Sequence, residues 1–196
     1  KVAIVKGNSP LQMVTLALKL VDAKQEFIGV QKVFVKPNYV LSMAPDAGVT
    51  TDTRVVAALI EFVKQCGIAD ITIGDGGAAD TEQTFDVVSI RGVAKRFGVK
   101  LLDLNRDISV EVAIPGGVAL KRANISKTVL ESDILINMPK LKCHHLALIS
   151  IGMKNLMGTM MPKSIMHDKL HEKIVDLVSL LKPKLTIVDG LIGMER

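Results

Sequence analysis

The stretch Ile134-Leu-Ile-Asn-Met-Pro-Lys-Leu-Lys-Cys-His-His145 joins an apolar run to a cluster of basic side chains. Residues 134–136 are typical of a strand buried on both faces, and Pro139 ends it because proline has no N–H to donate to a sheet. Two lysines and two histidines follow within six residues of that proline. Basic residues continue to Lys173, with six lysines against two acids, so this part of the chain carries most of the formal net charge of +5.

Strand-like and helix-like segments alternate on both sides of this stretch. We expect strands at residues 2–5, 32–36, 70–73, 100–104, 134–136 and 185–188, and helices at residues 11–23, 54–65, 85–97, 126–130, 151–157 and 167–180. Strands that alternate with helices imply crossover connections, hence a mostly parallel sheet with helices on both faces. The sequence therefore predicts a Rossmann-like α/β fold, with a small β-hairpin inserted at residues 108–120 around Pro115-Gly116-Gly117.

Composition narrows the class of protein. No linker or repeat divides the chain, so residues 1–196 are expected to form a single α/β domain, whose end soon after an expected strand is compatible with C-terminal truncation. No apolar run approaches the roughly 18 residues of a membrane span, and no signal-peptide pattern opens the chain, so we expect a cytoplasmic protein without a membrane partner.

Cys66 and Cys143 form no disulfide framework. One tyrosine and no tryptophan leave little for base stacking, which disfavours nucleic acid as a partner.

Polar segments follow four of the expected strands, and the carboxyl ends of parallel strands share one edge of the sheet, where ligands usually bind. Each segment is also compatible with an ordinary solvated turn. We predict that these segments form a Lys/His-rich site for a small anionic ligand that carries a carboxylate or a phosphate. The predicted substrate-binding residues are Lys36, Asn38, Asp75, Gly76, Lys140, Lys142 and Asn155.

Two residues near this edge are predicted to be catalytic. His144 alternates with Lys140 and Lys142, so an extended backbone would direct all three side chains the same way, and an imidazole transfers protons near neutral pH. Lys154 lies between glycines in Met-rich sequence, where an apolar environment would lower its pKa and make it a base or a nucleophile. His145 is expected to be structural. The protein would then be an enzyme or an enzyme component.

An alternative function is a metal or cofactor carrier that uses His144 and His167. His167 and His171 are four residues apart, a spacing that places both on one helical face and suits a divalent metal such as Zn²⁺ or Ni²⁺. The metal set predicted from the sequence is His144, His167 and Asp189. Histidines at this spacing are also common on the surface of ordinary amphipathic helices. A homo-oligomer remains open.

Several motifs occur together in one order along the chain: Lys36-Pro37-Asn38, Thr50-Thr51, Gly74-Asp75-Gly76, residues 137–144, Lys154-Asn155-Leu156-Met157-Gly158, His167 and Val188-Asp189-Gly190. With them the sequence resembles the domain of unknown function 362 family over nearly its whole length. Many members carry a ferredoxin-type module, so the resemblance implies a separate ferredoxin-type partner. Two cysteines cannot supply a four-cysteine cluster, so no iron–sulfur cluster is expected within this chain.

A second resemblance is to the lactate racemase family, whose nickel-pincer cofactor is held by a lysine and a histidine. The order of His144, Lys154 and His167 is similar to the order of the corresponding residue types in that family. Where that family has a G-G-R/K-K stretch, this sequence has Ile151-Gly-Met-Lys154. Because of this difference, we use the resemblance only as a guide to the expected geometry of the site.

Overall fold

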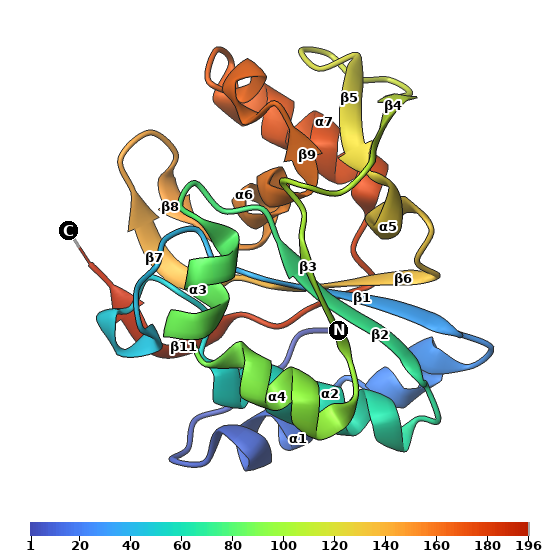
Figure 1. Ribbon diagram of the computed structural model, residues 1–196, viewed down its shortest axis with the longest axis vertical. Helices are drawn as coiled ribbons and strands as arrows, with labels where there is room; N and C mark the ends of the chain where they lie inside the picture. The colour runs from blue at the N-terminus through green and yellow to red at the C-terminus, as the bar shows by residue number, and fades with distance from the viewer. Residues whose placement is uncertain (196) are drawn as a thin grey trace.

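The computed structural model describes residues 1–195 and is built around a five-stranded sheet (Figure 1). All neighbouring strands of this sheet run parallel, which confirms the predicted α/β class with a parallel sheet. The strand order is β10 (Leu185–Thr186), β6 (Ile134–Met138), β1 (Lys32–Pro37), β2 (Asp70–Asp75) and β3 (Lys100–Asp103). The five carboxyl ends therefore lie along one edge, as the sequence-based prediction required.

Two layers cover the sheet because side chains alternate between its faces. Val33 and Val35 pack with the helices on one face, whereas Phe34 belongs to the core on the other face. The first face is covered by α1 (Pro10–Leu20), α2 (Thr53–Gln65) and α4 (Ile90–Phe97), with η1 (Ala23–Phe27) at its margin. The second is covered by α5 (Lys127–Leu130), α7 (Leu170–Leu181) and a small sheet of β4 (Ser109–Ala113), β5 (Arg122–Ser126) and β9 (Met160–Met161).

Helix α2 shows how local sequence sets these elements. Asp52 begins the helix by accepting a hydrogen bond from the backbone N–H of Arg54 at 2.8 Å. The apolar residues at helical spacing are buried against the sheet, namely Val55, Val56, Leu59, Ile60 and Val63. Gly67 follows the helix with a φ of 88°, a conformation that suits glycine. This helix was predicted from its apolar period and its flanking residues, and the prediction is confirmed.

A third sheet lies beyond the carboxyl edge of the central sheet, where the sequence predicted a loop. It consists of β11 (Asp189–Met194), β7 (Lys140–His144) and β8 (Leu148–Ser150). Pro139 does end β6, but the chain stays extended after it because β7 pairs with β11 on one side and β8 on the other. Asp189 follows the short strand β10, as predicted, but it also begins the new strand β11.

Other predicted boundaries were wrong for physical reasons. Residues 2–5 form no strand, because neither edge of the central sheet pairs with them, and Val2 and Ile4 are 92% and 94% exposed. The helix expected at residues 85–97 is divided into α3 (Thr81–Val87) and α4, because Ser89 between them has a φ of 60°. Helix α7 begins only at Leu170, so His167 and His171 do not share it. The predicted hairpin is confirmed as the antiparallel pair β4 and β5.

Four further short elements belong to the described chain: η2 (Pro45–Ala47), α6 (Gly152–Asn155), η3 (Leu156–Thr159) and η4 (Lys163–Met166). Helix α6 lies over the second face and contacts β6, β8 and α7. None of the helices in residues 1–195 is long and apolar enough to cross a membrane.

Candidate functional site

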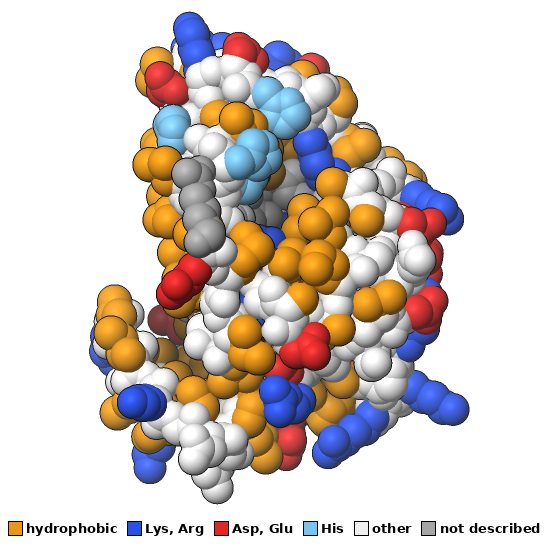
Figure 2. Space-filling model, turned by 90° about the vertical axis from the view of Figure 1, so that its left-hand side faces the viewer, with side chains coloured by type: hydrophobic (Ala, Val, Ile, Leu, Met, Phe, Trp, Pro, Cys, Tyr) orange, Lys and Arg blue, Asp and Glu red, His pale blue; other side chains and the backbone are white. Residues whose placement is uncertain are grey.

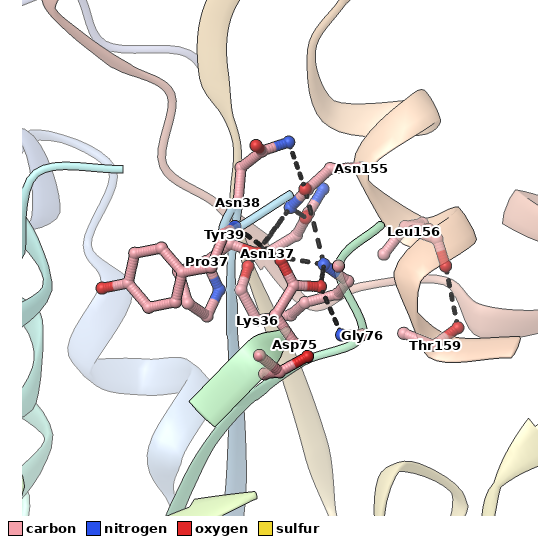
Figure 3. Close-up of polar contacts among 12 residues, drawn as sticks. Lys36, Pro37, Asn38, Tyr39, Asp75, Gly76, Asn137, Asn155, Leu156 and Thr159 are labelled. Atoms are coloured by element: carbon pink, nitrogen blue, oxygen red, sulfur yellow. Dashed lines mark hydrogen bonds and ion pairs between the residues drawn. The ribbon is translucent and has the colours of Figure 1, made fainter. Parts of the chain in front are cut away.

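A buried ion pair lies at the centre of the carboxyl edge (Figure 3). Lys36, near the end of β1, donates from Nζ to Oδ1 of Asp75 at 2.5 Å. The two side chains are only 1% and 4% exposed. The Asp75 carboxylate also accepts the backbone N–H groups of Tyr39 and Gly76, at 2.5 and 2.8 Å. The pair therefore fixes the exits of β1 and β2 relative to each other, and both groups are occupied within the protein.

Asn155 connects this pair to the neighbouring strands. Its Oδ1 accepts from Asn38 Nδ2 at 2.9 Å and from Lys36 Nζ at 3.4 Å. Its Nδ2 donates to Oδ1 of Asn137 on β6 at 2.8 Å. Asn155 is buried, and Figure 3 shows it between the ends of β1 and β6. The α6 helix is therefore held in place by polar contacts to two central strands.

Gly158 allows the chain to pass directly over the ion pair. A Cβ built on this residue would collide with Oδ1 of Asp75 and lie 2.8 Å from Nζ of Lys36. We expect Gly158→Ala to lower the free energy of unfolding by about 1–3 kcal/mol, since both crowded groups are buried and held by other contacts. Urea denaturation monitored by circular dichroism measures this change.

Gly92 in α4 provides the matched control. A Cβ on Gly92 meets no heavy atom within 4 Å, and alanine is favoured over glycine in a helix by about 0.5–1 kcal/mol. Gly92→Ala should therefore raise the unfolding midpoint. If both substitutions had the same sign, the crowding argument for Gly158 would be wrong.

A second buried ion pair lies beside the first. Lys140 at the start of β7 donates from Nζ to Oδ2 of Asp189 at 2.8 Å, and the side chains are 1% and 0% exposed. The same carboxylate oxygen accepts the backbone N–H of Asp52, at the start of α2, at 2.7 Å. Lys140 is thus neutralised by a carboxylate. This pair attaches the small β11-β7-β8 sheet to the N-terminal end of α2.

Two more lysines lie close by, and neither forms an ion pair with any carboxylate in residues 1–195. Lys142 is buried and donates to neutral oxygens, Asn38 Oδ1 at 3.0 Å and the carbonyl of Val49 at 2.7 Å. Burial lowers the pKa of Lys142 to about 8; the charge of Asp75 opposes this shift, and the positive charge of Lys154 adds to it. Burial, followed by the charge of Lys36, also lowers the pKa of Lys154. The site therefore has an excess of positive charge.

His144 lies at the end of β7, next to these lysines. Its Nδ1 accepts the backbone N–H groups of Leu146 and Ala147, both at 3.1 Å, so the proton of the neutral ring is on Nε2. Burial lowers the pKa of His144 to about 4, and nearby positive charge, that of Lys154 first, adds to the shift. The ring is consequently neutral at pH 7. It also stacks on His145, with ring centroids 4.7 Å apart.

A hollow marks this region on the surface. Figure 2 views the molecule from the side of the small sheet, where histidine side chains gather around a depression with a basic side chain inside it. His167 is among the groups whose charge lowers the pKa of His144, so it lies within electrostatic range of that ring. The face that carries the histidines thus has a hollow with positive charge inside it.

The structure brings most, but not all, of the predicted site residues together. Lys36, Asn38, Asp75, Lys142 and Asn155 form one connected set of polar contacts. The backbone N–H of Gly76 donates to Asp75, so this N–H is not available to bind a phosphate. Lys36, Asp75 and Lys140 are each paired within the protein, and their substrate-binding roles stay predictions.

The predicted metal ligands are arranged differently. His144 and His167 lie within electrostatic range of each other, but Asp189 lies at the opposite end of β7, next to Lys140. In the part of the chain that the structure describes, no group of three or more His, Cys, Asp or Glu side chains is placed to hold a metal ion. The divalent metal and the nickel-pincer cofactor stay predictions, and the proposal below does not depend on them.

Sequence reasoning missed two contributors to the site. Thr51 accepts the backbone N–H of Asn38 at 2.8 Å and donates to the carbonyl of Met138 at 2.8 Å, so it joins the exits of β1 and β6. Lys163 on η4 donates to Asn105 Oδ1 at 2.5 Å, and burial lowers its pKa. Thr51 had a signal, since it is part of the quoted motif. Lys163 had none, because η4 has no period that would place it.

Comparison with known proteins places the chain in a family. The family model described as a domain of unknown function, DUF362, matches residues 33–196. The chain belongs to the DUF362 family. The matched range contains every site residue described above, and it confirms the resemblance found from the sequence motifs.

Two relatives allow the length of this DUF362 chain to be compared with that of similar proteins. The thylakoid-associated protein sll1697 of Synechocystis sp. is 29% identical over 179 residues, which are 84% of this chain and 53% of that protein. The lactate racemase apoprotein of Thermoanaerobacterium thermosaccharolyticum has a similar structure, with a TM-score of 0.65 at 16% identity, over 92% of this chain and 49% of that chain. The DUF362 chain therefore spans about half the length of either relative, and the second likeness shows a shared fold.

Proposed function

We propose that this DUF362 domain binds a small carboxylate- or phosphate-bearing molecule between Lys142 and Lys154, beside His144. The observation that carries the proposal is the charge balance. Four lysines, Lys36, Lys140, Lys142 and Lys154, share this edge with two paired carboxylates, Asp75 and Asp189. Lys142 and Lys154 form no ion pair among the described contacts, and Asp75 acts on Lys142 only from beyond ion-pair distance, so a bound anion would supply a direct counter-charge.

Energetics support this reading. A buried ammonium group is expensive unless it is paired, and lysine responds to burial by a lowered pKa. Like charges add to this cost, since the charge of Lys154 disfavours the charged form of Lys142 and the charge of Lys36 disfavours that of Lys154. A carboxylate or phosphate placed between the two lysines would offset both the cost of burying their charges and the repulsion between like charges. A structural role is sufficient for Lys36 and Lys140, which form ion pairs with Asp75 and Asp189. It does not account for Lys142 and Lys154.

The site has the groups required for proton transfer, so we propose an enzyme or an enzyme component. Lys154 is the candidate acid and base, because its lowered pKa lets its ammonium group give up a proton to the reacting molecule and lets the neutral amine take one back. His144 is neutral at pH 7 and carries its proton on Nε2, which makes it a hydrogen-bond donor toward an oxygen that gains negative charge. In this assignment Lys142 binds the anionic group, Lys154 exchanges the proton and His144 polarises the reacting oxygen.

Anion binding should depend on pH in a defined direction. With a pKa of about 8, Lys142 is protonated below pH 8 and loses its charge above it. Affinity for acetate, whose own charge is constant above pH 6, is therefore expected to be highest below pH 8 and to fall by up to about tenfold per pH unit above it. Isothermal titration calorimetry with acetate, and with sulfate as a second anion of constant charge, measures this dependence.

The opposite dependence would contradict the assignment. If affinity rose with pH, or stayed constant between pH 6 and 10, the bound anion would not contact a lysine that titrates in this range. Absence of binding by acetate, sulfate and inorganic phosphate at low ionic strength would reject the proposed function itself. This experiment does not test the predicted homo-oligomer or the predicted ferredoxin-type partner.

A further inference from the structure

Strand β4 is the outer strand of the small sheet on the second face. Figure 1 shows it at the margin of the molecule, and in the part of the chain that the structure describes β5 is the one strand paired with it. Four of its five residues are exposed and the fifth is half-buried. The side of β4 that faces away from β5 is therefore open to a partner.

Backbone hydrogen bonds at the two ends of β4 show which of its groups point outward. The carbonyl of Ile108 accepts the N–H of Lys127, and the N–H of Ile114 donates to the carbonyl of Lys121. The register between these two bonds is continuous. Alternate residues of an antiparallel strand direct their backbone groups to opposite sides, so the even-numbered residues bond to β5. The odd-numbered residues direct their N–H and C=O groups away from β5, namely Ser109, Glu111 and Ala113.

This edge lacks the features that usually keep edge strands apart. Exposed edges are commonly protected by proline, by lysine or by a bulge. Residues 108–113 contain neither proline nor lysine, and their pairing with β5 has no bulge. The single charged side chain among them, Glu111, already forms an ion pair with Arg122. The edge is therefore able to accept another strand.

One face of β4 also leaves part of an apolar core uncovered. Val110 is directly opposite the buried Ile125, and Val112 packs against the same core. Ile108 lies on this face too, because it is two residues before Val110 in an extended chain. Ile108 and Val110 are nevertheless 67% and 40% exposed. A neighbouring strand with apolar residues on the same face would cover both side chains.

We propose that this neighbour is β4 of a second copy of the chain, in an antiparallel pair centred on Val110. The outward backbone groups of Ser109 would bond to those of Glu111 in the other copy, and the reverse. Val110 would face its own counterpart, and Ile108 would face Val112, so each apolar side chain would meet another. The three strands of each copy would then join into one sheet of six. This inference is independent of the proposed anion site.

Charge and backbone chemistry favour this centre over the other symmetric ones. A pair centred on Glu111 would place two carboxylates directly opposite each other, and a pair centred on Ser109 would place Asp107 opposite Glu111. Like charges in directly opposite positions are destabilising. A pair centred on Val112 would use Pro115, which has no N–H to donate. The proposed centre avoids both penalties, so the strand is complementary to itself in one register.

Sedimentation velocity over a range of protein concentrations measures the association. Small interfaces are weak, so a monomer–dimer equilibrium is expected between about 10 µM and 1 mM. Ser109→Pro should weaken it by about tenfold or more, because it removes one outward N–H from each copy. Proline is tolerated at the start of an edge strand when the N–H points outward, so circular dichroism should show an intact fold. Ser109→Ala is the matched control, which keeps the N–H and should dimerise as the wild type does.

Cysteine cross-linking tests the register. In Val110→Cys the two introduced thiols would face each other in a pair without hydrogen bonds, where the Cα atoms are about 4.5 Å apart and a disulfide can form. In Glu111→Cys the thiols would be two residues out of register, roughly 7 Å along the strand. Mild oxidation should therefore give a covalent dimer of Val110→Cys but not of Glu111→Cys, relative to the wild type with its free Cys66 and Cys143.

Three results would overturn the inference. A wild-type protein that stays monomeric at about 1 mM would exclude a second copy as the partner of β4. A dimer that Ser109→Pro leaves unchanged would use another surface. Cross-linking of Glu111→Cys in place of Val110→Cys would show a different register. Acetate binding is unaffected by any of these outcomes, so the anion site and the strand pairing can fail separately.

Discussion

Asp75→Asn should lower the free energy of unfolding by about 3–5 kcal/mol, the range typical when one partner of a buried ion pair is removed. The substitution keeps the size of the side chain but leaves the Lys36 ammonium group buried without its counter-charge. Chemical denaturation at neutral pH measures the change. The double variant Lys36→Met with Asp75→Asn should be more stable than Asp75→Asn alone, because the uncompensated charge has then been removed.

Asp70 supplies a control on the same strand. It begins β2 and pairs with Lys100 at 2.9 Å, but its side chain is 39% exposed and that of Lys100 is 71% exposed. Exposed pairs contribute about 0–1 kcal/mol, so Asp70→Asn should have little effect. If Asp70→Asn and Asp75→Asn were equally mild, the buried pair would not be the element that fixes the carboxyl edge.

Lys142→Met should weaken anion binding by about a hundredfold at pH 7, because it removes a buried charge that contacts the ligand in our proposal. The same substitution should not reduce stability. The pKa of about 8 lies below the ordinary value of 10.5, which means that the charged lysine opposes folding at neutral pH. A variant that is equally or more stable but does not bind the anion would separate a binding role from a structural one.

Lys154→Met is expected to show the same loss of binding, and Lys100→Met is the control for net charge. Lys100 is exposed at the start of β3, at the opposite edge of the sheet from the site. Equal losses in Lys100→Met and Lys142→Met would indicate non-specific attraction by the basic protein. Unchanged acetate binding in Lys142→Met would show that the anion binds elsewhere.

The parallel sheet could be predicted because short apolar runs followed by helical periods leave few alternatives. The same rule placed Lys36, Asn38, Asp75 and Lys142 at one edge before any coordinates were known. The sequence pattern could not show whether residues 2–5 pair with another strand. An apolar segment indicates that a strand is possible, but it does not identify the strand with which it would pair. The pattern also could not show that residues after Pro139 would pair again, in a second sheet.

The electrostatic pairing of the site was not predictable from the sequence. Lys36, Lys140 and Lys142 each lie between uncharged residues in the sequence, yet in the described chain the first two form ion pairs with carboxylates and the third forms none. The partners are 39 and 49 residues away, so each assignment depends on how two strands that are distant in the sequence lie relative to each other. Residue type identified the cations. Only the folded arrangement separates those that hold the protein together from those available to a ligand.

Lys154 and Asn155 are consecutive residues of a helix of a single turn. The asparagine is bonded to the ends of β1 and β6, so the proposed base cannot be displaced without disturbing the centre of the sheet. Local opening of the protein at this edge and release of its occupant would then be one event. Occupancy would be reported by slower amide hydrogen exchange in strands that never touch the bound molecule.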